Sequence, residues 1–382
     1  MTTRSELELY IHIPFCVQKC NYCDFLSFSA QSKEMQEYVQ ALLRQIEYQK
    51  LEAKEYMVTT VFIGGGTPSL LSNKQMKDVF AKLHEVFHIM REAEITIEVN
   101  PGTVNEEKLH NYKALGINRL SIGLQSTHEV ELKTLGRIHT YSEFAKTYAQ
   151  AREAGFDNIN IDLMSAIPGQ SVASWQTNLK KVLKLEPEHI SVYSLIIEEG
   201  TPFARWYQEE HLHSEYPPIP SEEVMLQMDD VTEKELKKQE YVRYEISNYA
   251  KKGYECRHNL GYWNRKEYLG LGLGAASYIE NERFKNTSNM AKYIENPEAL
   301  EERQKLTRQE QMEEFCFLGL RKIEGIVEKD FQEQFQVSIQ DVYAKELSEL
   351  QEEGLLERNG SEISLTKRGL ELGNYVFVKF VL

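Results

Sequence analysis

Three cysteines lie close together near the amino end of the chain, at Cys16, Cys20 and Cys23. Their C-x3-C-x2-C spacing places three thiolates on one tight loop, where they can bind a metal ion or one face of an iron–sulfur cluster. A structural zinc site needs four protein ligands, and the nearest further donors are His12 and Asp24. A 4Fe–4S cluster normally has four cysteine ligands, so three leave one iron open for an exchangeable ligand. The spacing favours such a cluster, with zinc as the alternative.

A glycine-rich stretch, GGGTPS (64–69), follows the second strand-like run of the chain. Because Gly65 and Gly66 carry no side chain, their backbone amides and carbonyls can approach a ligand closely, beside Thr67. The alternative is a plain glycine-rich turn. A Walker-type phosphate loop is excluded, since the Gly-Lys-Ser/Thr that it requires is missing.

Polar side chains stand within or just after three later strand-like runs: Glu98, Gln125, Arg137 and Asp162. A single charge near a strand end is usually a solvated residue at the rim of the sheet. In βα folds, however, the chemistry collects at the carboxyl ends of the strands. Four such residues converging on one edge therefore predict a ligand site there.

A second group of residues, in CRHNLGYWNRKEYLGLGLGAAS (256–277), gathers His258, Tyr262 and Trp263. Taken alone, a histidine among aromatic residues is more often packed and hydrogen-bonded in a core. The run from Gly270 to Ala275 nominally fits a dinucleotide-binding fingerprint. It lacks the preceding strand and following helix of a βαβ unit, so we discard that interpretation.

Strand-like and helix-like segments alternate up to about residue 200, which predicts a parallel sheet covered on both faces. Periodicity alone leaves an open doubly wound sheet and a partial barrel as alternatives. The predicted strands are 7–15, 59–66, 93–101, 117–125, 158–169 and 189–197. The predicted helices are 33–54, 72–90, 104–115, 141–154 and 172–185, with Ser72, Asn105 and Ser142 as plausible N-caps.

A different pattern follows a proline-rich linker at 215–220, which precedes a predicted helix at 221–239. The region 241–278 is rich in Tyr, Asn and Gly. The last eighty or so residues predict a separate α+β unit of winged-helix-like order, with a hairpin around Asn359-Gly360. Its helices are expected at 307–322, 327–336 and 339–353. Because this unit is not basic, DNA binding is disfavoured.

The composition is that of a globular, acidic chain. Its 382 residues include 44 Lys and Arg against 59 Asp and Glu, a formal net charge of −15, which argues against nucleic acid as a partner. Five cysteines, three of them bunched, do not form a disulfide framework. We find no signal peptide pattern and no apolar run of membrane-spanning length. The expected location is the cytoplasm, where thiols stay reduced.

The stretch YIHIPFCVQKCNYCDF (10–25) resembles the cluster loop of the radical S-adenosylmethionine (SAM) superfamily, and its flanks resemble the coproporphyrinogen-dehydrogenase-type branch. This resemblance implies a TIM-like partial (βα)6 barrel with the cluster at its mouth, beside the winged-helix-like α+β domain that the order of elements predicts at the carboxyl end. It implies a 4Fe–4S cluster held by the three cysteines, with SAM on the fourth iron. The expected division is a radical SAM core at 1–236, a connecting region at 237–300 and a carboxyl-terminal domain at 301–382.

Residue-by-residue matching to this branch implies which positions contact SAM. Carboxylates suit its hydroxyls and ammonium group, while an arginine suits its carboxylate. Ile196 carries the least weight, because a buried strand isoleucine needs no ligand to explain it. The implied SAM contacts are Tyr10, Tyr22, Gly65, Gly66, Thr67, Glu98, Gln125, Arg137, Asp162 and Ile196.

The H-N-x-x-Y-W string at 258–263 resembles the heme-binding motif of heme chaperones in the same branch. Imidazole is a natural axial ligand of heme iron, and aromatic rings offer flat apolar surfaces to a porphyrin, so His258 is the expected heme ligand. Cys256 is a secondary candidate, although an ordinary buried thiol explains it better. The coproporphyrinogen oxidases of this branch carry a further cysteine where this chain has Phe25, and a long extension before the cluster. Both differences favour a chaperone.

The resemblance therefore implies a heme chaperone that binds heme, a 4Fe–4S cluster and SAM and transfers heme to an acceptor hemoprotein, membrane proteins included. Whether SAM is turned over stays open, and both monomer and homodimer are compatible with the sequence. One alternative is an oxygen-independent coproporphyrinogen III oxidase. Another is a radical SAM enzyme with a different substrate, and the third is a zinc-stabilised interaction protein.

Overall fold

A single large sheet organises the computed structural model, which describes residues 4–29, 31–207 and 216–381. Its centre consists of six parallel strands that neighbour one another in chain order. They are β1 (Ser5–Ile13), β4 (Tyr56–Gly65), β5 (Ile89–Val99), β6 (Arg119–Gln125), β7 (Ile159–Ser165) and β8 (His189–Ser194). Every residue of β6 is buried, as expected of a central parallel strand covered on both faces.

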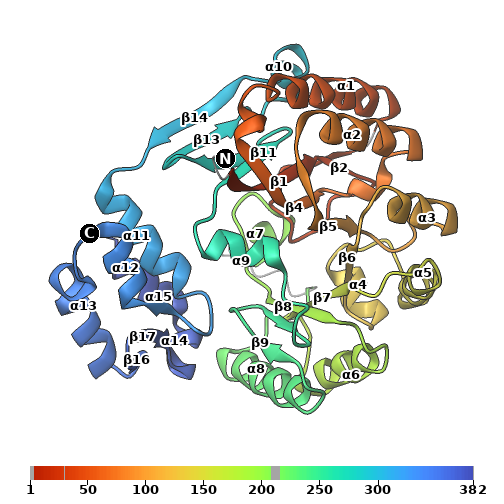
Figure 1. Ribbon diagram of the computed structural model, residues 1–382. Helices are drawn as coiled ribbons and strands as arrows, with labels where there is room; N and C mark the ends of the chain where they lie inside the picture. Colours follow the sequence, from red (N-terminus) through yellow and green to blue (C-terminus); the bar gives the residue numbers. More distant parts are fainter. Residues whose placement is uncertain (1–3, 30, 208–215, 382) are drawn as a thin grey trace.

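The strand order settles which parallel architecture forms. A doubly wound sheet reverses its order at a switch point, whereas these six strands advance in one direction. β1 and β8 do not pair with each other, so the result is the expected partial (βα)6 barrel. The helices cover its outer side (Figure 1). They are α1 (Ser32–Tyr48), α2 (Asn73–Val86), α3 (Glu106–Ala114), α4 (Glu129–Thr134), α5 (Tyr141–Glu153) and α6 (Val172–Leu183).

Local capping explains where these helices begin. Ser72 and Gln75 form a reciprocal capping box at α2, and the Asn105 side chain caps α3, as predicted. The prediction for α5 was wrong: its cap is Thr140 rather than Ser142, because Thr140 forms a capping box with the glutamate three residues later. The predicted helix 72–90 ends at Val86, and the residues after it begin β5.

Short strands from the region after residue 240 extend the sheet on both sides. On the β8 side these are β10 (Asn248–Ala250) and β9 (Val242–Arg243). On the β1 side, β11 (Tyr268–Leu271) pairs in parallel with β1 and is followed by β12 (Ala276–Ile279), β13 (Glu282–Asn286) and β14 (Leu300–Lys305). Helix α8 (Glu222–Lys237) precedes this region, and α9 (Arg257–Trp263) and α10 (Met290–Glu295) lie within it.

The carboxyl-terminal segment forms its own small core around Phe331, Tyr343 and Leu350. The predicted hairpin forms with Gly360 at its turn (φ +65°). The order of elements is winged-helix-like, and the unit lies to one side of the barrel (Figure 1). Its elements are α11 (Arg308–Gly319), β15 (Ile326–Val327), α12 (Glu328–Phe335), α13 (Ile339–Glu352), β16 (Leu356–Asn359), β17 (Glu362–Leu365), α14 (Lys367–Glu371) and α15 (Gly373–Val378). Among the described residues, no helix combines the length and apolar character that a membrane crossing requires.

Candidate functional site

The cysteine loop is anchored at both ends before any ligand is considered. Two short strands, β2 (Phe15–Cys16) and β3 (Phe28–Ser29), pair in parallel and close its base. In the middle of the loop, the Asn21 amide donates to the carbonyl of Leu135 at 2.9 Å, and its side-chain amide donates to that of Thr134 at 3.0 Å. The loop is therefore held against the segment that follows α4, at the carboxyl end of the barrel.

The three loop cysteines are free and partly exposed, and two of their sulfurs accept hydrogen bonds. The Thr67 hydroxyl donates to Cys16 Sγ at 3.6 Å, and the Arg137 guanidinium donates to Cys20 Sγ at 3.7 Å. Burial raises the pKa of the Cys23 thiol to about 11. Within the described part of the chain, no three His, Cys, Asp or Glu side chains are placed to hold one metal ion. Three soft donors with hydrogen bonds to sulfur fit an iron–sulfur cluster.

A cavity of about 530 Å³ opens beneath this loop and brings together most of the predicted site residues. The segments that line it come from the cysteine loop and from the carboxyl ends of the parallel strands. Of the predicted residues, Cys16, Cys20, Tyr22, Cys23, Gly65, Gly66, Thr67, Glu98, Gln125, Arg137, Asp162 and Ile196 line the cavity. Their individual roles toward a ligand stay predictions.

Two half-buried carboxyl groups face this cavity, and desolvation is the largest influence on the pKa of both. Glu98 has its pKa raised to about 8 by burial and by the nearby charge of Asp162. Its Oε2 atom accepts a hydrogen bond from the Gly65 amide at 3.0 Å. Burial also raises the pKa of Asp162, which accepts hydrogen bonds from Asn160 at 2.7 Å and Ser121 at 3.1 Å. The pair offers acceptors, and in the protonated form donors, to a polar ligand.

Arg137 and Gln125 also line the cavity, and two hydrogen bonds fix the Arg137 side chain. The Arg137 guanidinium donates to Asn100 Oδ1 at 2.7 Å and to the carbonyl of Gly123 at 2.8 Å. Gln125 has φ +67°, which is unusual for a residue with a side chain, and its buried Oε1 has no hydrogen-bonding partner in the described part of the chain. Such strained backbone and unpartnered polar atoms cluster at ligand sites.

Two predicted residues lie elsewhere than expected. Ile196 was expected as a buried strand residue, but β8 ends at Ser194 and Ile196 is 63% exposed at the cavity rim. Its place on the cavity wall therefore does not follow from core packing. Tyr10 does not line the large cavity; it shares a hydrogen bond with His12 at 2.9 Å and faces a smaller pocket.

Several cavity residues were missed by the sequence analysis, and Arg119 is the most informative. It is 2% exposed, and its Nε atom has no hydrogen-bonding partner among the described residues. The signal was present in the sequence, since a charge inside the apolar run INRLSIGLQ is unusual. Other missed residues with polar or aromatic side chains include Phe62, Asn100, Thr103, Ser121, Asn160, Ser191, Tyr193 and Asn259.

His258 lies on α9, inside the curve of the sheet, and is 1% exposed. Its Nδ1 shares a hydrogen bond with the Thr60 hydroxyl at 2.7 Å, and its Nε2 shares one with the Tyr262 hydroxyl at 3.1 Å. The ring stacks on Phe62 at 5.2 Å, and burial lowers its pKa to about 3. The imidazole is therefore neutral, as an iron ligand must be, but both nitrogens are engaged within the protein. Heme ligation by His258 stays a prediction.

Cys256, just before α9, is fully buried, and its thiol donates to Glu94 Oε1 at 3.6 Å. This arrangement matches the expected ordinary buried thiol. The Glu94 carboxylate also accepts the amides of Arg257 and His258, both at 3.2 Å. One buried carboxylate thus holds the amino end of α9 against β5.

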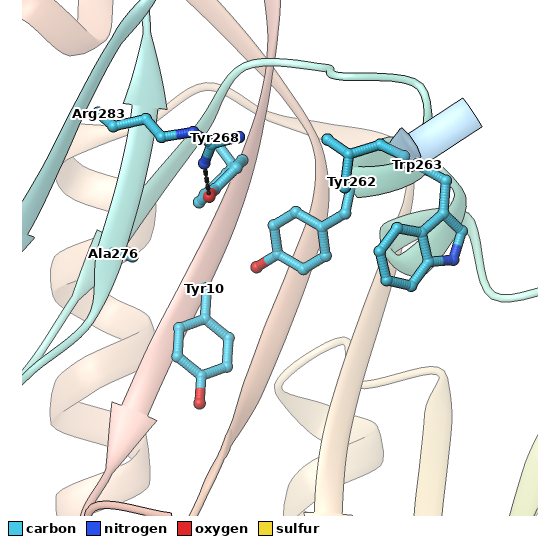
Figure 2. Close-up of a pocket in the computed structure, with 7 residues that line it drawn as sticks. Tyr10, Tyr262, Trp263, Tyr268, Ala276 and Arg283 are labelled. Carbon is cyan, nitrogen blue, oxygen red and sulfur yellow. Dashed lines mark hydrogen bonds between the residues drawn. The ribbon is translucent and has the colours of Figure 1, made fainter. Parts of the chain in front are cut away.

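A smaller pocket of about 340 Å³ lies between β1, α9 and the extended sheet (Figure 2). The rings of Tyr262 and Trp263, both from the H-N-x-x-Y-W string, form one side of it. Arg283 lies across from them and donates to the Tyr268 hydroxyl at 2.9 Å. The pocket is lined by Tyr10, Tyr262, Trp263, Tyr268, Ala276, Arg283 and Leu318. Aromatic faces with one cation suit a flat ligand that carries an anionic group.

Comparison with known proteins places this site in a family. Residues 10–182 match the model of the radical SAM superfamily, and residues 306–372 match the HemN C-terminal domain. The chain is 37% identical to the heme chaperone HemW of Bacillus subtilis (97% of this chain, 98% of the relative). It is 35% identical to that of Lactococcus lactis (98% and 97%).

The solved structure of the Escherichia coli coproporphyrinogen III oxidase HemN, a radical SAM enzyme, is also similar. It superposes with a TM-score of 0.86 at 25% sequence identity, covering 99% of this chain and 90% of that chain. The match extends over both the barrel and the carboxyl-terminal unit. With near full-length similarity to the two chaperones, the chain belongs to the HemW family of the radical SAM superfamily.

Proposed function

We propose that this chain binds heme and passes it to an acceptor hemoprotein, and that it holds a 4Fe–4S cluster and SAM in the large cavity. The observation that carries the proposal is the pairing of two features in one barrel. The cysteine loop and the polar strand ends surround one cavity, and the helix with the H-N-x-x-Y-W string packs against the same sheet, where His258 hydrogen-bonds with Thr60 of β4. The family's named heme chaperones support the same function.

Cys16, Cys20 and Cys23 would hold the cluster, with Thr67 and Arg137 donating hydrogen bonds to two of the sulfurs. Such donors stabilise thiolate ligands and tune the cluster. Glu98, Gln125 and Asp162 would contact SAM. The Glu98 carboxyl also accepts a hydrogen bond from the Gly65 amide. When bound, the cluster and SAM together supply one-electron chemistry.

The heme is expected beside α9, at the smaller pocket. Tyr262 and Trp263 offer apolar ring faces there, and Arg283 offers a cation for a propionate. His258 becomes available to iron once Tyr262 releases its Nε2 atom. A shift of the Tyr262 side chain is therefore part of the proposed binding event.

Heme titration of His258→Ala tests the ligand directly. We expect a weaker complex with an altered absorption spectrum, because the axial imidazole is removed. His84→Ala is the matched control, since His84 lies exposed on α2. An unchanged affinity and spectrum in His258→Ala would remove that histidine as the heme ligand.

The second candidate function is oxygen-independent oxidation of coproporphyrinogen, which the structural similarity to HemN favours. Phe25 argues against it, because this residue occupies the position of the additional oxidase cysteine and lies 65% exposed at the cavity wall. An anaerobic assay with coproporphyrinogen and SAM separates the two functions. Formation of protoporphyrinogen supports the oxidase, and its absence with retained heme binding supports the chaperone.

A further inference from the structure

A buried carboxyl group lies beside the proposed heme ligand without a hydrogen-bonding partner. Glu8, on β1, is 1% exposed, and its Oε2 atom has no hydrogen-bonding partner in the described part of the chain. That oxygen lies 3.8 Å from Nδ1 of His258. A buried polar atom without a hydrogen-bonding partner costs free energy. Its presence therefore points to a partner that is gained in a ligand-bound state.

The backbone of α9 is shaped to lie against this carboxyl group. A Cβ atom at Gly261 would come within 2.0 Å of Glu8 Oε1, so a side chain at this position cannot be accommodated without displacing Glu8. Glycine within a helix costs about 1 kcal/mol relative to alanine. Its position on the face of α9 that meets Glu8 allows the close approach of helix and carboxyl group.

The two nitrogens of the His258 ring face different surroundings. On the Nδ1 side lie Thr60, at 2.7 Å, and Glu8. On the Nε2 side lies the hydroxyl of Tyr262, whose ring lines the smaller pocket. Nε2 is therefore the nitrogen that points toward a residue of the pocket, while Nδ1 faces Thr60 and Glu8; His258 itself does not line the pocket.

We propose that Glu8 is a positioning residue for heme ligation: it accepts a hydrogen bond from Nδ1–H of His258 and thereby directs Nε2 to the iron. This inference rests on the proposed function. A metal-bound histidine usually donates its other ring N–H to a carboxylate or carbonyl, which fixes the tautomer and raises the basicity of the ligand. Glu8 can accept in either protonation state, because a protonated carboxyl keeps its carbonyl oxygen. The 3.8 Å separation requires an approach of under about 1 Å to reach hydrogen-bond length.

The test compares heme binding by Glu8→Gln with that of the unchanged chain. We expect a roughly ten- to hundredfold weaker complex, the usual effect of removing an outer partner of a metal ligand. The midpoint potential of the bound heme should also shift, since the substitution replaces the group that faces Nδ1 by an amide that carries N–H donors of its own. Glu6→Gln is the matched control, because Glu6 lies exposed on the same strand and pairs with Lys266 at 2.8 Å. Equal affinity and potential in Glu8→Gln and the unchanged chain would overturn the proposal.

Thr60 is the competing partner of Nδ1, and Thr60→Val distinguishes the two. If Thr60 alone orients the ring, Thr60→Val shifts the potential and Glu8→Gln does not, which overturns the role of Glu8. A different result would show that the proposed heme ligand itself is wrong. In that case His258→Ala binds heme with the affinity of the unchanged chain, and the proposed role of Glu8 is wrong as well.

A measurement on the unchanged chain guards against a Glu8→Gln protein that does not fold. Resonance Raman spectroscopy of the ferrous heme complex reports the iron–histidine stretching frequency. We expect it above that of heme bound by an imidazole whose Nδ1–H has no acceptor, because a hydrogen bond from that N–H strengthens the iron–nitrogen bond. A frequency equal to that of the reference without an acceptor would overturn the proposal without any variant.

Discussion

Gly65 shows how much of the site depends on one missing side chain. Its φ of +111° lies in a region that favours glycine, and a Cβ atom there would come within 2.4 Å of the His12 ring. Its amide also donates to Glu98. Gly65 thus meets three requirements: it adopts a positive φ, it allows the His12 ring of β1 to lie close to its backbone, and its amide orients the Glu98 carboxyl in the cavity.

Replacing Gly65 by alanine should lower the unfolding free energy by about 2–4 kcal/mol, from strain and steric overlap combined. Gly155→Ala is the control, because Gly155 also has a positive φ (+84°), but a Cβ atom there would meet none of the described residues within 4 Å. It should cost only about 1 kcal/mol. Urea denaturation of both proteins measures the difference, and equal losses would show that the contact with His12 does not matter.

Most residues of the large cavity could be predicted because parallel strands end at one edge of a sheet. Glu98, Gln125 and Asp162 are far apart in sequence yet meet there by topology alone. Arg119 was missed because it begins its strand, far from the edge where polar residues were sought, and reaches the cavity through a long side chain. Tyr10 lines another pocket because segments from after residue 240, among them β11 beside β1, form that pocket in a region where the sequence predicted no strands.

At the scale of elements, one carboxylate meets the amino end of α9. Glu94 accepts the first two amides of the helix, which have no acceptor within the helix itself. Helix α9 has only seven residues, so it is too short to be stable without such contacts.

The variant Glu94→Gln should loosen α9, because the neutral amide accepts less strongly and turns a donor toward the helix amides. We expect a cost of about 1–2 kcal/mol, which corresponds to roughly tenfold faster hydrogen exchange over residues 257–263. Glu92→Gln is the control, since Glu92 is exposed on the same strand. Unchanged exchange in Glu94→Gln would mean that packing, and not this carboxylate, holds the helix.

Long, strongly patterned elements could be predicted, and short ones could not. The six central strands and the helices between them carry their own hydrophobic patterns, and the hairpin at Gly360 has a local turn signal. By contrast, β11 has four residues and pairs in parallel with β1, more than 250 positions earlier in the chain. Such pairing is decided by the tertiary fold, so a local pattern cannot reveal it.

At the scale of the whole molecule, one carboxylate on α11 connects the carboxyl-terminal unit to the barrel. Glu314 accepts from Arg265, which follows α9, at 3.2 Å and from Arg283, on β13, at 2.5 Å. The Arg321 guanidinium adds a contact over the Trp263 ring, at 4.5 Å from its centre. The contacts on Arg283 and Trp263 involve residues of the smaller pocket, so the position of the unit bears on the proposed heme site.

Glu314→Gln should lower the unfolding free energy by about 2 kcal/mol, because it leaves two largely buried guanidinium groups without their charge partner. Glu282→Gln is the control, since the ion pair of Glu282 with Arg303 is solvent-exposed and should contribute under about 1 kcal/mol. Urea denaturation monitored by tryptophan fluorescence compares the two variants. Similar small losses would show that the pairs at Glu314 are not important for stability.

The buried carboxyls also set how the stability of the whole chain depends on pH. Burial raises the pKa of Glu8 and of Glu98 to about 8, against 4.5 for an ordinary glutamate. The folded chain therefore keeps two protons that the unfolded chain releases near pH 4.5. Their contribution to stability is present below that pH and is lost as the pH rises to about 8. Burial lowers the pKa of His258 and His139, to about 3 and 4, and this gives the opposite trend up to about pH 6.5.

Above pH 6.5, the ordinary pKa of histidine, the opposing trend from the histidines fades, so Glu8 and Glu98 dominate the change up to pH 8. We expect the unfolding free energy of the cluster-free chain to fall across it, by about 1 kcal/mol for each carboxyl after allowance for water penetration. Glu8→Gln and Glu98→Gln should each flatten the decline, because an amide does not titrate, while Glu6→Gln on the surface should leave it unchanged. Urea denaturation at pH 6.5, 7.25 and 8 measures the slope. A stability that stays level or rises across this window would contradict the protonated state assigned to both groups, since the sign follows directly from their raised pKa values.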